Sequence, residues 1–256
     1  VVKMGTRGVA ALPLELNWGP ENKVFSVYAE DFNKNALSVF GYDPTADDIL
    51  LVKEALKRAR TLMIYRVNSG GKKATATVGG VTVTAAYGGT RGNAISVAIL
   101  TNADNATNVD VVTYLDGMVM DSQTVAKATG SANLKANDFV TFGSASSLTP
   151  AVATPLTGGT NGTVNGAAHT AALNAFEVES FNVVGYPGTD EEIKSLYATF
   201  VKRLRDDEGN PINMEGAQIT YTFTGTDNGN QPYEGDTLPK NAGVYSVVVH
   251  IDGLTN

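Results

Sequence analysis

The chain has 256 residues, of which 43% are hydrophobic and 18% charged, and its formal net charge at pH 7 is -7. This length predicts two or three domains, and the composition is typical of a globular protein with hydrophobic cores. The negative charge disfavours direct binding to nucleic acid or to an anionic membrane surface. Since the chain has no cysteine, disulfides, thiolate catalysis and cysteine-built zinc sites are excluded. No window has the ~18 apolar residues of a membrane span or the apolar run of a signal peptide, so we expect a soluble intracellular protein.

Residues 1–69 are predicted to form the first part of an α/β layered domain. A helix is expected after Thr45, its predicted N-cap, because apolar residues recur there with helical spacing. Its apolar face is formed by Ile49, Val52, Leu56 and Ala59. Alternating or continuous apolar runs predict strands over 9–12, 23–28 and 61–67, and a short helix is expected over 31–40.

Residues 70–155 are predicted to form an inserted all-β domain, a barrel or a sandwich. Thr, Ala, Val, Gly and Asn dominate this region, and apolar residues alternate along it. Strands are expected over 81–87, 95–100, 109–115 and 118–125. Asp116-Gly117 between the last two predicts a two-residue hairpin with positive φ angles. The Ser, Thr, Gly and Pro-rich segment 144–163 is predicted to be a linker.

Residues 156–212 are predicted to be the second part of the α/β domain. A helix is expected from about Ala167 with Leu173, Phe176 and Ser180 on one face, followed by a strand over 181–186. A longer helix follows, with Thr189 and Glu192 as a capping box, and it ends near Gly209 and Pro211. Its apolar stripe consists of Ile193, Leu196, Phe200, Val201 and Leu204.

Residues 213–256 are predicted to be a β-rich C-terminal segment, with strands over 218–224 and 244–251 and a turn over 227–230. The fold class predicted from the whole pattern is therefore α+β and multi-domain. In it an α/β layered domain is interrupted by an inserted all-β domain and followed by the β-rich segment.

Residues suited to catalysis are few, and we predict no catalytic, cofactor-binding or metal site. The two histidines, His169 and His250, lie in different predicted elements, which favours solvated or structural roles. The acidic groups 47–48 and 190–192 fall in first helical turns, where the helix dipole accounts for them. The group 206–208 lies at a helix C-terminus and is interpreted as a solvated turn, since the ligand spacing of an EF-hand is missing.

Two glycine-rich stretches, 70–73 and 158–162, are interpreted as turns, because neither has the residue pattern of a phosphate-binding loop. Trp18, the single tryptophan, is interpreted as a packing residue rather than a ligand-stacking one.

Four segments in a fixed order resemble contractile phage tail-sheath proteins, in particular those of Gram-positive phages, prophage-like elements and bacteriocin particles. The resemblance covers roughly residues 5–209. The segments that carry it are GTRGVAALPLELNWGP (5–20), AYGGTRGNAISV (86–97), LTGGTNG (156–162) and YATFVKRLRDDEG (197–209).

The resemblance implies a β domain inserted into an α/β domain and a structural role without a cofactor. Sheath subunits stack as hexameric rings in a helical polymer around an inner tube, joined by terminal arms that add strands to neighbouring sheets. Contraction drives the tube through the cell envelope. The implied location is the tail of a virion or phage-tail-like particle, assembled in the bacterial cytoplasm.

The chain departs from the family pattern at both ends. The N-terminal arm expected before Gly5 is nearly absent, and after Gly209 the C-terminal sheath domain does not follow, so a monomeric state of this chain is a further expectation. Instead, residues 213–252 resemble an MBG or bacterial immunoglobulin-like repeat. Truncation, fusion and editing all stay open as causes.

Two other classes of function stay open at this point. One is a non-enzymatic bacterial surface adhesion or binding module, which the final β segment favours. The other is an enzyme on the α/β layer, which would need a cleft that holds His169 or His250 beside carboxylates.

Overall fold

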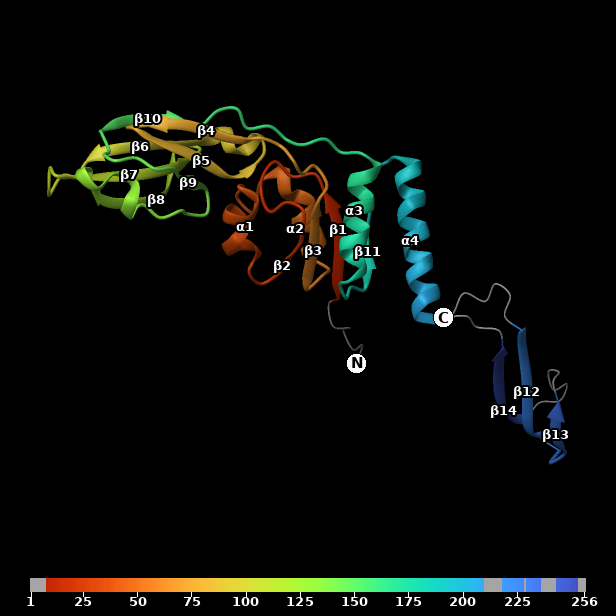
Figure 1. Cartoon of the computed structure of the whole chain (residues 1–256). Helices are drawn as coiled ribbons and strands as arrows, with labels where there is room; N and C mark the ends of the chain where they lie inside the picture. Colours follow the sequence, from red (N-terminus) through yellow and green to blue (C-terminus); the bar gives the residue numbers. More distant parts are fainter. Residues whose placement is uncertain (1–7, 210–217, 228, 236–242, 253–256) are drawn as a thin grey trace. The chain divides into compact units, whose positions relative to one another are not determined.

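The structure is a computed structural model that describes residues 8–209, 218–227, 229–235 and 243–252 (Figure 1). The chain divides into two compact units, Val1–Lys202 and Arg203–Asn256. The first unit contains an α/β layer and a β-sandwich, and the second contains a small antiparallel sheet.

The α/β layer is built on a four-stranded sheet with the order β11-β1-β3-β2. Strands β1 (Val9–Leu14), β3 (Thr61–Arg66) and β11 (Val183–Val184) are parallel, and β2 (Val24–Tyr28) is antiparallel to β3. Helices α1 (Phe32–Phe40) and α2 (Leu50–Leu56), with the 3₁₀ turn η1 (Asp47–Ile49), share a core with one face of the sheet. The core residues on these elements include Val27, Phe32, Phe40, Val52, Leu62 and Ile64.

Helix α3 (Gly166–Glu177) lies against the other face of this sheet. Successive side chains of a strand point to opposite faces. Ile64 therefore faces α1 and α2, while the neighbouring Tyr65 contacts Phe176 of α3 with ring centroids 6.4 Å apart. Helix α4 (Glu191–Gly209) follows β11, and its residues Tyr197 and Phe200 are buried.

The β-sandwich consists of two sheets, β10-β6-β7-β8 and β4-β5-β9, whose inner faces share one hydrophobic core. The first sheet contains β6 (Ile95–Thr101), β7 (Asn108–Leu115), β8 (Met118–Ala126) and β10 (Ala151–Pro155). The second contains β4 (Lys73–Val78), β5 (Val81–Gly88) and β9 (Val140–Phe142). Short 3₁₀ segments, η2 (Thr90–Ala94) and η3 (Lys127–Asn133), connect these strands.

The second unit contains a three-stranded antiparallel sheet with the order β13-β12-β14. Its strands are β12 (Gln218–Asp227), β13 (Pro232–Gly235) and β14 (Gly243–Asp252). The strands predicted over 218–224 and 244–251 are therefore confirmed, and each is longer than predicted. Of the predicted turn, Asn228 lies outside the described residues.

Most strands and helices predicted from periodicity are confirmed. Ile49, Val52, Leu56 and Ala59 are all buried, as predicted for one face, although α2 ends at Leu56 and Ala59 therefore lies beyond the helix. The Asp116-Gly117 hairpin has φ angles of 51° and 79°, as a turn with two left-handed residues requires. The expected sharing of one sheet by the first and later α/β segments is seen in the pairing of β1 with β11.

Several local predictions are wrong. Thr45 does not cap the following helix, because its amide and hydroxyl both donate to Asp43 Oδ1 at 2.9 and 2.6 Å. Asp190, not Thr189, caps α4: its Oδ1 accepts from the amides of Glu192 and Ile193 at 2.9 and 3.0 Å.

The extents of three segments also differ from the prediction. The predicted linker 144–163 contains β10, which pairs with β6, so this part belongs to the sandwich. The strand predicted over 181–186 is reduced to the two residues of β11. Ser180 lies beyond the end of α3 and is exposed, so it is not part of the buried face.

Candidate functional site

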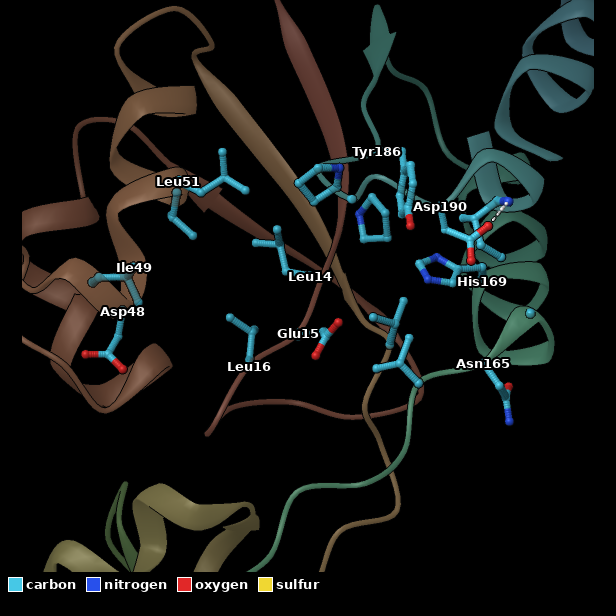
Figure 2. A pocket seen from close by; sticks show the side chains of 18 residues that line it. Leu14, Glu15, Leu16, Asp48, Ile49, Leu51, Asn165, His169, Tyr186 and Asp190 are labelled. Atoms are coloured by element: carbon cyan, nitrogen blue, oxygen red, sulfur yellow. Dashed lines mark hydrogen bonds between the residues drawn. The ribbon is translucent and has the colours of Figure 1, made fainter. Parts of the chain in front are cut away.

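A pocket of about 410 Å³ lies where the parallel strands of the α/β layer end. Its floor is formed by residues that end β1 or follow it, Leu14 to Leu16, as Figure 2 shows. On one side lie residues of η1 and α2, and on the other lie the start of α3 and the segment that leads into α4. In sheets of this kind the crevice beyond the carboxyl ends of the strands is the usual place for ligands.

His169 is the buried titratable residue of this pocket, with 5% of its surface exposed. Its Nδ1 lies 3.2 Å from the Tyr197 hydroxyl, and its ring contacts Tyr186 edge to face with centroids 5.3 Å apart. The rings of Tyr186 and Tyr197 stack on each other at 5.4 Å. The three side chains thus join α3 to α4 and to the segment after β11.

Burial favours the uncharged forms of His169 and Tyr197. Burial lowers the pKa of the His169 imidazole below its ordinary value, against a smaller opposing effect of the Glu15 and Asp190 carboxylates. Burial also raises the pKa of the Tyr197 hydroxyl, and the nearby Tyr186 adds to this effect. An uncharged imidazole and an uncharged phenol can share one hydrogen bond without leaving a charge buried.

Glu15 and Asp48 are exposed carboxylates at the rim of the pocket, and Asp190 supplies a third. Among the described residues no group of three or more His, Asp and Glu side chains is arranged to hold a metal ion. The described lining residues include no serine, threonine, cysteine or lysine. The titratable groups of the described lining are therefore carboxylates, one imidazole and one phenol.

A second polar site joins the α/β layer to the β-sandwich. Arg66, at the end of β3, has no exposed side-chain surface. Its Nη1 donates to the carbonyls of Gly88 and Gly19 at 2.8 and 3.2 Å, and its Nε donates to Asn68 Oδ1 at 3.2 Å. Glu21 lies 3.1 Å from Nη1 and forms the ion pair. Burial lowers the pKa of the guanidinium, and Glu21 acts in the opposite direction.

Arg91, in η2, makes a second connection across this junction. Its Nε donates to the carbonyl of Gly41, which ends α1, at 2.6 Å. Its guanidinium lies 4.4 Å from the centre of the Tyr42 ring and forms an ion pair with Asp116 of the hairpin. The hairpin that turns between β7 and β8 is thus held to the α/β layer.

The two chain segments that pass between the layer and the sandwich lie side by side. The amide of Thr160 donates to the Lys72 carbonyl, and the amide of Lys72 donates to Thr160 Oγ1, both at 3.1 Å. Gly162 donates to the Asn68 carbonyl at 3.1 Å. A Cβ on Gly162 would lie 1.9 Å from the Ser69 carbonyl oxygen, so only glycine fits this contact. The two glycine-rich stretches were predicted to be turns. In the structure they are irregular connecting segments that pack on each other, and Lys73 is already part of β4.

Three of the segments that carry the family resemblance meet at this junction. Asn161 Nδ2 donates to Asn17 Oδ1 at 2.7 Å, and Asn161 Oδ1 accepts from the amide of Thr90 at 3.1 Å. Asn93 exchanges two hydrogen bonds of 2.9 Å with the backbone of Gly159. The polar residues of these segments therefore join separate stretches of backbone at the junction.

The residues considered from the sequence have different locations in the structure. Trp18 is 1% exposed and packs in the sandwich core against Tyr87 and Phe139, so the packing interpretation is confirmed. His169 is buried near carboxylates, so it is neither solvated nor isolated. The side chains of His250 and of residues 206–208 lie outside what the structure describes, so their roles stay predictions.

Sequence reasoning missed Arg66 and Arg91 as junction residues and missed the pocket. For Arg66 a signal was present, because a charge within the apolar run 61–67 must find partners once it is buried. For the pocket there was no comparable signal, since its lining comes from separate segments that only the fold brings together.

Comparison with known proteins agrees with this architecture. Residues 7–67 match the family described as tail sheath protein Gp18 domain III N-terminal region. Residues 69–161 match the phage tail sheath protein beta-sandwich domain. The chain belongs to the phage tail-sheath family, as its sequence resemblance predicted.

Two curated proteins of Bacillus subtilis (strain 168) are similar to the chain. The uncharacterized protein YqbK is 37% identical over 233 residues, which cover 82% of this chain and 48% of YqbK. The phage-like element PBSX protein XkdK is 35% identical over 245 residues, which cover 88% of this chain and 51% of XkdK. The chain thus spans about half the length of these relatives.

Two crystal structures of sheath tail proteins are also similar. That from Desulfitobacterium hafniense has a TM-score of 0.74 at 42% identity, over 82% of this chain and 49% of that protein. That from Listeria innocua has a TM-score of 0.70 at 32% identity, over 91% of this chain and 54% of that protein. None of the helices in the described ranges is both long and apolar enough to cross a bilayer.

Proposed function

We propose that the chain acts as a structural subunit of a contractile tail sheath, in a phage tail or a phage-tail-like particle. The observation that supports this most strongly is the junction between the α/β layer and the β-sandwich. There the segments typical of the family meet through polar contacts, such as those of Asn161 with Asn17 and Thr90. The buried Arg66 donates to the backbone of two of these segments at Gly19 and Gly88. A subunit that must transmit motion needs such connections between its parts.

The proposal includes the domain organisation predicted from the sequence. An α/β domain made of residues 1–69 and 156–212 is interrupted by an inserted β domain, residues 70–155. The paired crossings at Lys72 and Thr160 support this organisation, because the chain leaves and re-enters the layer at one place. The β-rich segment 213–256 is a separate module, and its resemblance to a bacterial immunoglobulin-like repeat stays a prediction.

The partners in this proposal are other sheath subunits, in hexameric rings of a helical polymer, and the inner tube protein. The particle is assembled in the bacterial cytoplasm, and contraction drives the tube through the cell envelope. The role is structural and uses no enzymatic activity or cofactor. The burial of His169, which lowers its pKa, and its contact with the Tyr197 hydroxyl support a structural role for the one histidine whose side chain is described.

The test is coexpression of the chain, in its natural gene product, with the tube protein encoded beside it. Negative-stain electron microscopy is expected to show striated cylinders of sheath around the tube. A matched pair of variants sharpens the result. Arg66→Met breaks the junction, whereas Lys57→Met removes only an exposed ion pair with Glu54. Failure of the unaltered proteins to form cylinders, with both soluble and folded, would contradict the proposal. Display of the native protein on the cell surface would favour the adhesion module instead.

A further inference from the structure

The pocket of Figure 2 has the size and lining of a binding site. Its volume of about 410 Å³ falls in the usual range for ligand pockets, roughly 300–1,000 Å³. The floor and walls are largely apolar, with Leu14, Val52 and Ile193 among them. Leu51, also part of the lining, is 45% exposed although it is a large hydrophobic residue. Leu14 and Val52 are already buried, so the apolar surface that an occupant with an apolar stem would remove from water is mainly that of Leu51.

The polar groups at the rim carry negative charge. Glu15 and Asp48 are exposed, and neither forms an ion pair with a lysine or arginine in the part of the chain that is described. Asp190 uses Oδ1 to cap α4. The described lining residues include no lysine or arginine that would offset these charges. The rim is therefore complementary to a cation.

His169 provides an independent observation that points to a ligand. The side chain is 95% buried, and Figure 2 shows its ring pointing from α3 into the pocket. Nδ1 is used by Tyr197, while no hydrogen-bond partner of Nε2 is found among the described residues. Nε2 is not among the buried atoms that lack a partner, so this nitrogen opens on the pocket, where water or an occupant can bond to it.

We propose that this pocket binds an arginine side chain presented by an extended segment of a partner polypeptide. The aliphatic stem covers the apolar floor, and the guanidinium meets the carboxylate of Glu15 on the side of His169, while Asp48 adds negative charge on the opposite side of the rim. Arginine suits the pocket better than lysine, because a guanidinium is planar, less strongly hydrated and favourably placed beside an aromatic ring such as Tyr186. The proposal does not depend on whether the chain forms a sheath.

The test is an NMR titration of the ¹⁵N-labelled chain with acetyl-Gly-Arg-Gly-amide in about 150 mM salt, which screens loose surface attraction. The chain has two histidines, so a His250→Asn variant leaves the imidazole signal of His169 by itself. We expect this signal to shift and saturate. The same peptide with citrulline, which has nearly the same shape but no charge, is expected to bind at least about tenfold more weakly, because the charge complementarity is lost.

Matched variants locate the binding. The double change Glu15→Gln with Asp48→Asn is expected to abolish saturation, while Asp104→Asn, an exposed acid in the loop between β6 and β7, leaves it unchanged. If the double variant loses the native amide spectrum, Glu15→Gln alone decides the question. No saturable shift of His169, equal binding of the citrulline peptide, or full binding by the folded rim variants would each overturn the proposal.

Discussion

Replacing Arg66 with methionine tests whether the buried charge at the junction stabilises the fold. Methionine keeps an apolar stem of similar length but removes the donors to Gly19, Gly88 and Asn68 and the ion-pair partner of Glu21. Breaking a buried ion pair from one side typically costs about 3–5 kcal/mol, because the remaining charge stays without compensation. Glu21 is 22% exposed and can be partly rehydrated. We therefore expect a loss of about 3 kcal/mol, at the low end of that range.

The assay is urea unfolding followed by fluorescence of Trp18, the single tryptophan. Trp18 lies in the sandwich core, and its indole N–H donates to the Ser38 carbonyl of α1 at 3.3 Å, so its signal reports on both sides of the junction. Lys57→Met is the control. Its ion pair with Glu54 is exposed, and such pairs contribute about 0.2–1 kcal/mol.

A loss below about 1 kcal/mol for Arg66→Met would refute this reasoning, because the desolvation of Arg66 would then offset its contacts almost completely. The same conclusion follows if Arg66→Met and Lys57→Met have equal effects. A second substitution, Glu21→Gln, completes a double-mutant cycle. The two changes are expected to be less than additive, since each removes the same interaction.

Three further predictions follow from other contacts. Gly162→Ala places a Cβ 1.9 Å from the Ser69 carbonyl oxygen and is expected to lower the urea unfolding midpoint strongly. The control is Gly166→Ala in the first turn of α3, where the added Cβ has open space, and it is expected to leave the midpoint unchanged or to raise it. Equal effects of the two substitutions would contradict the close packing at Gly162. The pKa of His169 is lower in the folded than in the unfolded chain, so stability is complete above the unfolded value of about 6.5 and falls as the pH drops below it. Urea midpoints measured from pH 8 to pH 5 check this fall, and His169→Gln should flatten it; an unchanged slope would rule out His169 as its source. Asp116→Asn keeps the hairpin turn but removes the ion pair with Arg91. We expect the free energy of unfolding in urea to fall by about 0.5–1 kcal/mol, and this difference to disappear at high salt. A loss that does not depend on salt would indicate a defect in the turn instead.

The elements that periodicity predicted well are those in which burial and local geometry agree. The face of Ile49, Val52 and Leu56 could be read from its spacing, and the Asp116-Gly117 hairpin from its turn chemistry. Strand β10 could not be predicted, because only Val152 and Thr154 of its five residues favour strands, whereas its two alanines and Pro155 do not. Its conformation depends on pairing with β6, which lies about fifty residues earlier in the chain.

The caps show a different limit of sequence reasoning. Thr189 and Asp190 are adjacent and both are good N-cap residues, so the sequence alone does not choose between them. At Thr45, a neighbouring Asp43 competes for the hydroxyl, and this local turn replaces the predicted cap. The pocket and the arginine junction required distant segments to meet, and the resemblance to a family supplied their order but not their contacts.

The side-by-side crossings at Lys72–Thr160 and Asn68–Gly162 affect how the β-sandwich can move against the layer. A domain connected through one chain segment can rotate about that segment. Rotation of a domain connected through two hydrogen-bonded segments distorts at least one of them. Arg66 and Arg91 add further contacts between the sandwich and the α/β layer, so we expect a rotation of the sandwich to strain these bonds rather than to occur freely at a hinge.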